Sequence, residues 1–292
     1  MTLSREELKE IENTLVELAT TQVGPLIKGQ AGTKFDSYED KANNVDLVTV
    51  VDKKVENIIY EALSKKYPDF DFIGEESYVV GETKIGEKPT FIVDPIDGTT
   101  NFIHGYPYSC TSLGLAEGGR AVVGVVYNPH LNQLFHASKG NGAYLNGEPV
   151  TVAPRALTLQ KSVVAFEGGS ERSEGPEGNF DCKMATLKNL LSDKGGYIHG
   201  FRSVGSAAMN LCYVANGMLD AYWEAGPWAW DVCAGWCILN ETGGVMVDAN
   251  PNRWDIPLDN RSYFAVRGGS SVQEQKWFIE AFWSHVEGTM KF

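Results

Sequence analysis

The chain has 292 residues, of which 43% are hydrophobic, so it can bury a sizeable core. Its formal net charge of -13 excludes a protein built around a basic nucleic-acid-binding face and disfavours anionic membrane surfaces. The most apolar stretch, residues 221–239, is interrupted by Glu224, Pro227 and Asp231, so no membrane span is expected. The five cysteines include no Cys-x-x-Cys pair and the first residues form no apolar signal segment. We therefore expect a reduced, cytoplasmic protein, without excluding access to the nucleus.

The first predicted element is an amphipathic helix that begins at about Arg5. Ser4 and Glu7 form a capping-box pattern ahead of it, and apolar residues recur on one face. The Gly24-Pro25 pair is expected to kink or end this helix, because proline cannot donate the helical hydrogen bond. Residues 29–44 are rich in Gly, Lys, Asp and Asn and are expected to form an exposed loop or a loose hairpin.

A second helix is predicted up to about residue 66, with Thr49 as its N-cap. Asp52 then lies in the first turn, where a carboxylate gains roughly 0.3–1 kcal/mol from the helix dipole. Taken alone, this residue therefore has a sufficient structural role. A short strand over residues 70–73 leads into Glu75-Glu76, which is either a solvated turn or a pair of acids near the next strand.

Residues 91–102, Phe-Ile-Val-Asp-Pro-Ile-Asp-Gly-Thr-Thr-Asn-Phe, are the most informative stretch. The apolar residues predict a buried strand that stops at Asp94 and is followed by a tight turn with Asp97. Paired carboxylates on a strand-end loop suit a divalent cation such as magnesium. The Gly98-Thr99-Thr100 sequence offers backbone N–H groups where a phosphate can dock. The alternative is an ordinary acidic turn, because Asp-Pro and Asp-Gly are common turn formers.

The rest of the chain is predicted to mix strands and helices. Strands are expected over residues 112–116, 121–127, 134–137, 219–223, 245–247 and 263–266, with hairpin turns at 117–120 and 146–147. Helices are expected over about 181–191, from about 204, after Asp231 and after Ser271. In this reading Asp231 can simply cap its helix.

Two segments of this region are left open by their composition. Residues 167–180 are rich in Gly, Glu and Ser and are expected to form a mobile loop, to which we assign no contacts. Gly205, Ser206 and Ala207 open a helix with small side chains. Such residues allow either a ligand to approach the backbone N–H groups or the helix to pack tightly on a sheet.

Four acids, Glu75, Asp94, Asp97 and Asp231, stand at predicted strand ends or loop-to-helix junctions, where ligand sites of layered α/β proteins collect. At these positions the chain resembles the inositol monophosphatase family. Residues 74–76 with 94–102 resemble its first signature, apart from a missing tryptophan. Residues 230–235 with 241–244 resemble its second signature, and the resemblance covers nearly the whole chain.

The resemblance implies a layered α/β fold, an α-β-α-β-α sandwich of the inositol monophosphatase and fructose-1,6-bisphosphatase-like superfamily. It implies one catalytic unit over residues 1–292, with an N-terminal α+β part over about 1–150 and a C-terminal α/β part over about 151–292. The implied activity is magnesium-dependent hydrolysis of inositol monophosphate to myo-inositol and phosphate by a metal-activated water, without a covalent intermediate. Homodimers, inhibition by lithium, and a place in inositol biosynthesis and phosphatidylinositol signalling are implied as well.

The resemblance also assigns metal ligands and catalytic residues. Two to three magnesium ions per site would be held by Glu75, Asp94, the Ile96 carbonyl, Asp97 and Asp231. Asp52 and Thr99 would position and deprotonate the attacking water, together with Glu75, and Lys41 would complete the metal site from an early loop.

The same resemblance implies a set of substrate contacts. The backbone of Gly98 and Thr99 would cradle the phosphate, and Gly205, Ser206, Ala207 and Glu224 would contact substrate hydroxyls. Further implied substrate contacts are Glu75, Ile96, Asp97 and Asp231. The implied partner is thus a small phosphate monoester, with no nucleic acid and no membrane.

Three alternatives remain at this stage. A haloacid-dehalogenase-type phosphatase would use Asp94 as a covalent nucleophile, but its acids stand two residues apart, whereas Asp94 and Asp97 are three apart. A nucleotide 3'-phosphatase or a sugar or inositol bisphosphatase of the same superfamily is disfavoured by a negatively charged Glu224 and by the compact length. A non-catalytic metal-binding scaffold is disfavoured because crowded acids destabilise a fold unless a cation binds them.

Overall fold

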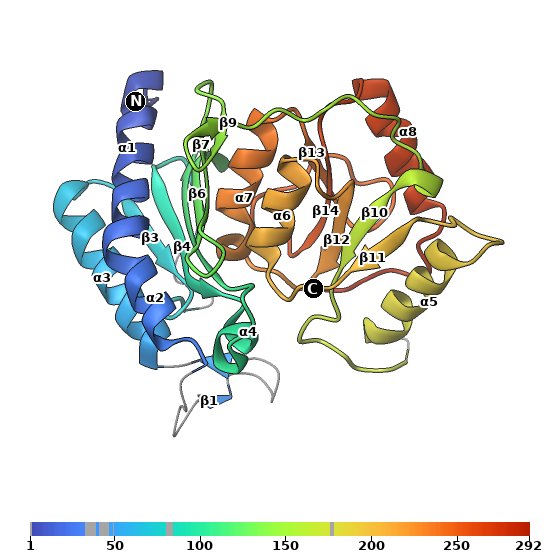
Figure 1. Ribbon diagram of the computed structural model, residues 1–292, viewed down its shortest axis with the longest axis horizontal. Helices are drawn as coiled ribbons and strands as arrows, with labels where there is room; N and C mark the ends of the chain where they lie inside the picture. The colour runs from blue at the N-terminus through green and yellow to red at the C-terminus, as the bar shows by residue number, and fades with distance from the viewer. Residues whose placement is uncertain (1, 33–38, 41–46, 49, 80–83, 176–177) are drawn as a thin grey trace.

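The computed structural model describes residues 2–32, 39–40, 47–48, 50–79, 84–175 and 178–292. Both helices and strands are distributed along the whole chain (Figure 1). The α-helices are α1 (Arg5–Leu18), α2 (Gly24–Gln30), α3 (Val50–Lys66), α4 (Thr99–His104), α5 (Phe180–Leu191), α6 (Ala207–Ala215), α7 (Ala229–Glu241) and α8 (Val272–Trp283). A π-helical segment, Ala19–Val23, joins α1 to α2, and Leu159–Lys161 forms a 3₁₀ turn.

The strands form three sheets. A two-stranded sheet pairs β1 (Glu39–Asp40) with β2 (Leu47–Val48). A seven-stranded sheet contains, in spatial order, β3 (Asp71–Gly74), β4 (Thr90–Asp97), β5 (Cys110–Glu117), β6 (Arg120–Asn128), β7 (Gln133–Ser138), β8 (Ala143–Leu145) and β9 (Glu148–Pro149). A five-stranded sheet contains, in spatial order, β11 (Gly200–Arg202), β10 (Val163–Phe166), β12 (Ala221–Ala225), β14 (Ser262–Val266) and β13 (Val245–Val247).

The two larger sheets alternate with three layers of helices (Figure 1). Helices α1, α2 and α3 cover the outer face of the seven-stranded sheet, α6 and α7 lie between the sheets, and α5 and α8 cover the outer face of the five-stranded sheet. The predicted α-β-α-β-α sandwich is therefore confirmed. None of the helices in the described residues has the length and apolar character that crossing a membrane would need.

The alternation of side chains along β4 explains this layering. Phe91 and Val93 belong to the hydrophobic cluster with α1 and α3, whereas Ile92 belongs to the cluster with α6 and α7. Successive side chains of a strand point to opposite faces of its sheet. A strand covered by helices on both faces must therefore be apolar at every position, which is why residues 91–93 form a continuous apolar run.

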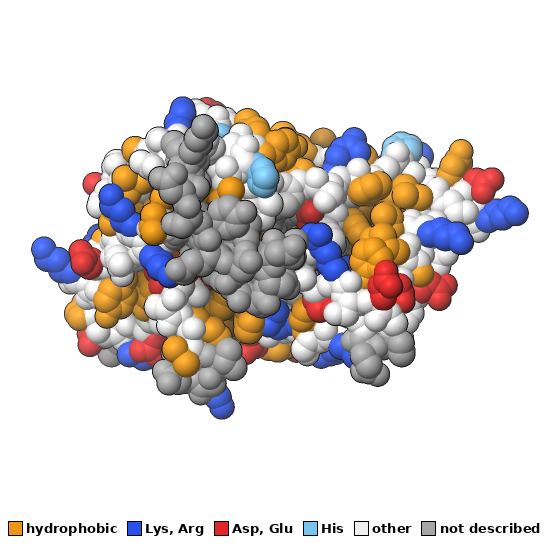
Figure 2. Space-filling view, turned by 90° about the horizontal axis from the view of Figure 1, so that it is seen from below, with side chains coloured by type: hydrophobic (Ala, Val, Ile, Leu, Met, Phe, Trp, Pro, Cys, Tyr) orange, Lys and Arg blue, Asp and Glu red, His pale blue; other side chains and the backbone are white. Residues whose placement is uncertain are grey.

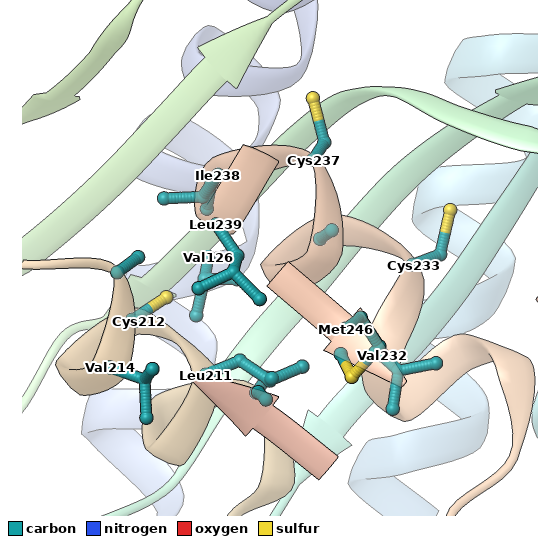
Figure 3. Close-up of a cluster of buried hydrophobic side chains, with 14 of the residues drawn as sticks. Val126, Leu211, Cys212, Val214, Val232, Cys233, Cys237, Ile238, Leu239 and Met246 are labelled. Atoms are coloured by element: carbon teal, nitrogen blue, oxygen red, sulfur yellow. The ribbon is translucent and has the colours of Figure 1, made fainter. Parts of the chain in front are cut away.

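Helix α7 packs very closely on the seven-stranded sheet, because two sheet positions are glycine. A Cβ atom at Gly114 would lie 2.6 Å from the Cys233 sulfur, and one at Gly124 would lie 2.1 Å from the Ala234 carbonyl oxygen. Figure 3 shows labelled side chains of α6, α7, β6 and β13 in the core between the sheets. This close approach fixes the position of α7, whose first turn carries Asp231.

The structure confirms most of the predicted elements and corrects five details. Strand β4 does not stop at Asp94 but continues to Asp97 through a shift in register against β5, so the two acids lie on a bulged strand end rather than on a free turn. The predicted 219–223 strand is displaced to β12, and strands β10 and β11 were not predicted.

The other two corrections concern helices. Of the two expectations for Gly24-Pro25, the end of the helix is wrong: helical structure continues from a π-helical segment into α2, where the proline stands at the start and has no N–H to leave unpaired. Asp231 is not the N-cap of α7 but lies in its first turn, and its Oδ2 accepts a hydrogen bond from the Trp228 backbone N–H at 2.5 Å.

We expect Gly124→Ala to lower the free energy of unfolding by about 1–3 kcal/mol, because the added methyl group would overpack the contact with α7. Urea denaturation would measure the change. Gly29→Ala is the matched control, since no atom lies within 4 Å of a Cβ there and alanine favours the α2 helix by about 0.5–1 kcal/mol. Equal stability of the two variants would contradict the close packing of α7.

Candidate active site

Three aspartates meet where the two larger sheets and the central helix layer come together. Asp94 and Asp97 lie on the bulged end of β4, and Asp231 lies in the first turn of α7. One carboxylate oxygen from each residue lies within 4.8 Å of the others. The bulge explains this geometry, because it turns both β4 acids toward the same place although they are three residues apart.

The environment of these aspartates opposes their ionisation. Burial, followed by the charge of Glu75, raises the pKa of Asp94 well above its usual range, and burial, followed by the charge of Asp97, does the same to the pKa of Asp231. Glu75, which follows β3, also hydrogen-bonds to Asp94. Among the described residues, no lysine or arginine forms an ion pair with these aspartates. An all-oxygen cluster of this kind fits a divalent cation such as magnesium, which would supply the missing positive charge.

Asp97 is held by the start of α6. Its Oδ2 accepts a hydrogen bond from the Ser206 hydroxyl at 2.5 Å and another from the Ala208 N–H at 2.9 Å. Burial raises the pKa of Asp97 to about 6 even though these hydrogen bonds favour the ionised form. Ser206 also caps α6, because its oxygen accepts from the Met209 N–H. The small residues at this helix start thus allow α6 to approach β4.

A threonine and an aspartate form a second group beside this cluster. The Thr99 hydroxyl lies 3.3 Å from Asp52 Oδ1 and 3.1 Å from the Ile96 carbonyl oxygen, and it donates to both. Asp52 is fully buried in the first turn of α3. The Ile96 N–H donates to Asp94 Oδ1 at 2.9 Å. The short segment from Asp94 to Thr99 therefore links the aspartate cluster to Asp52.

Gly98 makes the sharp turn between β4 and α4 possible. Its φ is +86°, and a Cβ there would lie 2.8 Å from the Tyr108 carbonyl oxygen and 3.0 Å from the Gly205 carbonyl oxygen. Only glycine fits both the left-handed backbone and this close contact. The glycine keeps the backbone of Gly98 and Thr99 next to the start of α6, which is where the resemblance places the phosphate.

A cavity of about 700 Å³ opens beside this turn, and Thr100 and Gly205 are among its lining residues. Glu75, Asp97 and Asp231 lie on one side of it, and Glu224 lines it from the end of β12. Tyr78, Trp228 and Trp230 form an aromatic wall, in which the two tryptophan rings stack with centroids 5.1 Å apart. The cavity thus joins a polar end at the aspartates to a flat, apolar side.

Glu224 is not the simple negative charge that the sequence suggested. It is 7% exposed, and burial raises its pKa to about 7, although nearby Lys183 favours the ionised form. The Tyr222 hydroxyl donates to Glu224 Oε2. Lys183, also buried, donates to the carbonyl oxygens of Gly168 and Ala225. Near neutral pH Glu224 is therefore only partly ionised, and it disfavours a substrate with a second phosphate less strongly than a fully charged glutamate would.

The expectation of a mobile loop without contacts over residues 167–180 is wrong for its first part. Glu167, Gly168, Gly169, Ser170 and Arg172 all line the cavity. Glu167 is buried, and its carboxylate accepts hydrogen bonds from the backbone N–H groups of residues 204 and 205 at 2.8 and 3.0 Å. The composition concealed this role, but Glu167 follows the apolar run 163–166 just as Asp94 follows residues 91–93.

The structure separates the other predicted site residues clearly. Glu75 lines the cavity, whereas Glu76 does not, and the Glu76 N–H donates to Glu56 of α3. Gly205, Ser206 and Ala207 line the cavity. Lys41 and Thr49 lie outside the described residues.

The sequence model of the inositol monophosphatase family matches residues 7–287 of this chain. The protein belongs to the inositol monophosphatase family. This family consists of phosphoric monoester hydrolases that depend on metal ions, so the chain is a phosphoric monoester hydrolase and the acidic cluster is a candidate metal centre.

Relatives and solved structures agree with this membership. The chain is 67% identical to inositol monophosphatase 2 of Saccharomyces cerevisiae over the full length of both chains. It is 41% identical to human inositol monophosphatase 1 over 86% of this chain and 87% of the human one. The crystal structure of the extragenic suppressor protein suhB from Bartonella henselae superposes with a TM-score of 0.78 at 32% identity, covering 94% of this chain and 98% of that one.

The raised pKa values predict a coupling between stability, pH and metal. The folded metal-free protein keeps protons on the aspartates that the unfolded chain would release, so its stability falls as the pH rises above the usual aspartate pKa of 3.8. The part of this loss that comes from Asp97 is complete once the pH has passed its folded-state pKa of about 6. Metal binding removes this penalty and releases protons. Magnesium should therefore raise Tm more at pH 7.5 than at pH 5 in differential scanning fluorimetry against a chelator control.

The proton release itself can be measured by titration calorimetry in two buffers with different ionisation enthalpies. Asp71→Asn is the matched control, because Asp71 is a half-exposed acid on β3 that forms an ion pair with Lys88. This substitution should leave both results unchanged. Magnesium binding without proton release at pH 6 would contradict the shared, partly protonated aspartate cluster.

Proposed function

We propose that the protein hydrolyses inositol monophosphate to myo-inositol and phosphate in a magnesium-dependent reaction without a covalent intermediate. The observation that carries the proposal is the meeting of Asp94, Asp97 and Asp231 within 4.8 Å, beside the hydrogen-bonded Thr99 and Asp52. The names of the yeast and human relatives support the substrate. The site draws on both halves of the chain, which supports a single catalytic unit over residues 1–292.

In this proposal the metal ligands are Glu75, Asp94, the Ile96 carbonyl, Asp97 and Asp231, and they hold two to three magnesium ions. When bound, magnesium polarises the phosphoryl, water and ester oxygens and offsets their negative charge. Asp94 already has one oxygen fixed by the Ile96 N–H and Asp97 has one fixed by α6, so the remaining oxygens have defined directions. Such support of metal ligands by hydrogen bonds is typical of preorganised sites.

Thr99 and Asp52 are proposed to orient the attacking water and to take up its proton. A water that donates to the Thr99 hydroxyl oxygen would lie beside the aspartate cluster, and Asp52 can accept the proton that the hydroxyl passes on. Asp52 is fully buried. The reaction balances when a proton equivalent to the one taken from the water reaches the ester oxygen, so that myo-inositol leaves as the alcohol. Glu75, next to Asp94, is the second group proposed to act on the water.

The substrate is proposed to lie in the 700 Å³ cavity. Its phosphate is proposed to lie on the backbone of Gly98 and Thr99, which stand in sequence between the lining residues Asp97 and Thr100. Its hydroxyl groups would meet Gly205, Ala207 and Glu224. Ser206 would contribute through its backbone, because its hydroxyl already donates to Asp97. A polyol ring has polar edges and flatter C–H faces, and the wall of Tyr78, Trp228 and Trp230 suits such a face.

The charge distribution is consistent with a small substrate. On the face seen from below, the coloured Lys, Arg, Asp and Glu side chains are interspersed rather than gathered into one basic patch (Figure 2). Homodimers, a cytoplasmic location and inhibition by lithium are further expectations, and they rest on the family resemblance and the composition alone.

Phosphate release from inositol 1-phosphate and from 3'-phosphoadenosine 5'-phosphate, measured side by side with and without magnesium, tests the proposal. We expect magnesium-dependent turnover of the inositol ester alone. Preference for the nucleotide would keep the metal site but overturn the proposed role of Glu224. If neither ester were hydrolysed, the scaffold alternative would replace the proposal.

Asp94→Asn should abolish turnover, because the amide removes a shared metal ligand. The metal-free variant should unfold at the same or a higher temperature than the wild type, since the substitution removes one of the repelling buried acids. Phosphate release and the Tm in chelator test both points, with Asp71→Asn as the control that retains activity. Near-normal turnover of Asp94→Asn would overturn the metal assignment.

Thr99→Ala should lower kcat by about 10²–10⁴-fold, the usual contribution of positioned acid–base groups, with little effect on Tm. Thr99→Ser keeps the hydroxyl and should retain most of the activity. Steady-state kinetics at saturating magnesium measures both variants. Equal loss in Ala and Ser would show that the methyl group rather than the hydroxyl matters.

A further inference from the structure

The last residues of the chain are tied down beside the candidate active site. Two asparagines hold them in reciprocal pairs: Asn250 bonds the N–H and carbonyl of Met290 at 2.8 and 3.0 Å, and Asn179 bonds those of Lys291 at 2.9 and 3.0 Å. The C-terminus lies near the middle of the view in Figure 1, just below α6 and β12. Phe292 then meets Gly226, since a Cβ at Gly226 would lie 3.4 Å from the Phe292 ring.

Arg261, the residue just before β14, holds the same turn. Its φ is +65°, a left-handed conformation that is uncommon for arginine, and its carbonyl oxygen accepts from the Gly226 N–H at 2.8 Å. Its guanidinium donates to the Gly226 carbonyl at 2.7 and 3.0 Å and to the Pro227 carbonyl at 3.1 Å. Four hydrogen bonds thus join one side chain and its backbone to two consecutive residues.

The Arg261 guanidinium also lies between two aromatic rings. Its central carbon is 3.4 Å from the centre of the Trp228 ring and 5.2 Å from the centre of the Phe292 ring. Both distances fall within the range of cation–π attraction, and a planar guanidinium stacks on an aromatic face. The Arg261 guanidinium therefore contacts both Phe292 and Trp228.

The turn held in this way joins two proposed site residues. It connects Glu224, at the end of β12, to Asp231, in the first turn of α7. The Trp228 N–H donates to Asp231 Oδ2 at 2.5 Å, and the Trp228 side chain lines the cavity. A displaced Trp228 would therefore change both the direction of the Asp231 carboxylate and the aromatic wall.

We infer that Arg261 and Phe292 form a clamp that positions Trp228 and, through it, the Asp231 carboxylate for metal binding. This inference rests on the proposed function, because Asp231 is a metal ligand only in that proposal. Arg261 and Phe292 touch no reacting atom in it and are positioning residues. The last residues are also linked to the cavity lining on β10's side of the chain: Asn179, which pairs with Lys291, donates its backbone N–H to Glu171, and Glu171 stands between the lining residues Ser170 and Arg172 in the sequence.

Titration calorimetry of magnesium into the chelator-treated full-length protein tests the clamp. Arg261→Lys keeps the charge but loses the planar stack and the forked hydrogen bonds, so we expect the magnesium Kd to rise about tenfold, the low end for lost support of a metal ligand. Phe292→Ala should raise Kd roughly two- to fivefold, as expected for the loss of one cation–π contact. Phe292→Tyr should restore wild-type binding.

Two control variants separate this effect from general damage. Arg120→Lys changes an exposed arginine paired with Asp255, and Trp277→Ala removes a 61% exposed aromatic ring from α8. Both should bind magnesium as the wild type does. A lower Tm with unchanged magnesium Kd in the Arg261 and Phe292 variants would overturn the clamp and leave only a packing role.

Hydrogen exchange measured by mass spectrometry on peptides that cover residues 226–231 gives a readout that needs no metal. Exchange should be faster in Arg261→Lys and Phe292→Ala than in the wild type, and unchanged in the two controls. If the wild type binds no magnesium, the proposed function fails, and unchanged exchange in these peptides would separately refute the clamp. Wild-type binding together with unchanged exchange and Kd in the variants would refute the clamp alone.

Discussion

The mutual repulsion of three aspartates is the constraint on which the rest of the site depends. Asp94, Asp97 and Asp231 are held within 4.8 Å in a largely buried layer, where their charges are poorly solvated. The fold compensates in part with donors: the Ile96 N–H, the Ser206 hydroxyl and the Trp228 N–H each point at one of these carboxylates. These donors fix the oxygens but leave the negative charge, and no lysine or arginine within the described part of the chain forms an ion pair with it, so the cluster is a candidate site for a cation.

Close approach of backbones brings the aspartates together. The bulge in β4 turns two of them toward one point, and the glycines of β5 and β6 let α7 carry the third to the same place. Gly98 has a similar role, because any side chain there would push the start of α6 away. The packing of the core therefore determines the geometry of the site, since a methyl group added beneath α7 would move a proposed metal ligand.

Sequence patterns predicted the parts of this arrangement that are local. The capping boxes, the helix over residues 50–66 and the hairpins follow from neighbouring residues, and the two signatures brought the aspartates together by resemblance. The parts that were missed depend on distant partners. The Glu167 carboxylate is held by backbone N–H groups that lie 37 and 38 residues away in the sequence. The charge of Glu224 depends on its burial and on Lys183. Composition showed a polar loop at 167–172 and could not show what that loop faces.

Distant partners also surround the two ends of the segment from Glu224 to Asp231. At one end, Tyr222 donates a hydrogen bond to Glu224 and Lys183 lowers its pKa. At the other end, the Trp228 N–H orients the Asp231 carboxylate. Residues 225–230 separate them, and the carbonyl groups of Gly226 and Pro227 in this turn accept hydrogen bonds from Arg261. A site that must place a proposed metal ligand and a proposed substrate contact a few residues apart needs that turn to be rigid. A glycine and a proline alone would not make it rigid, because the Gly226 φ of +123° is not fixed by its own side chain. The rigidity has to come from outside the turn, and Arg261 is where the structure provides it.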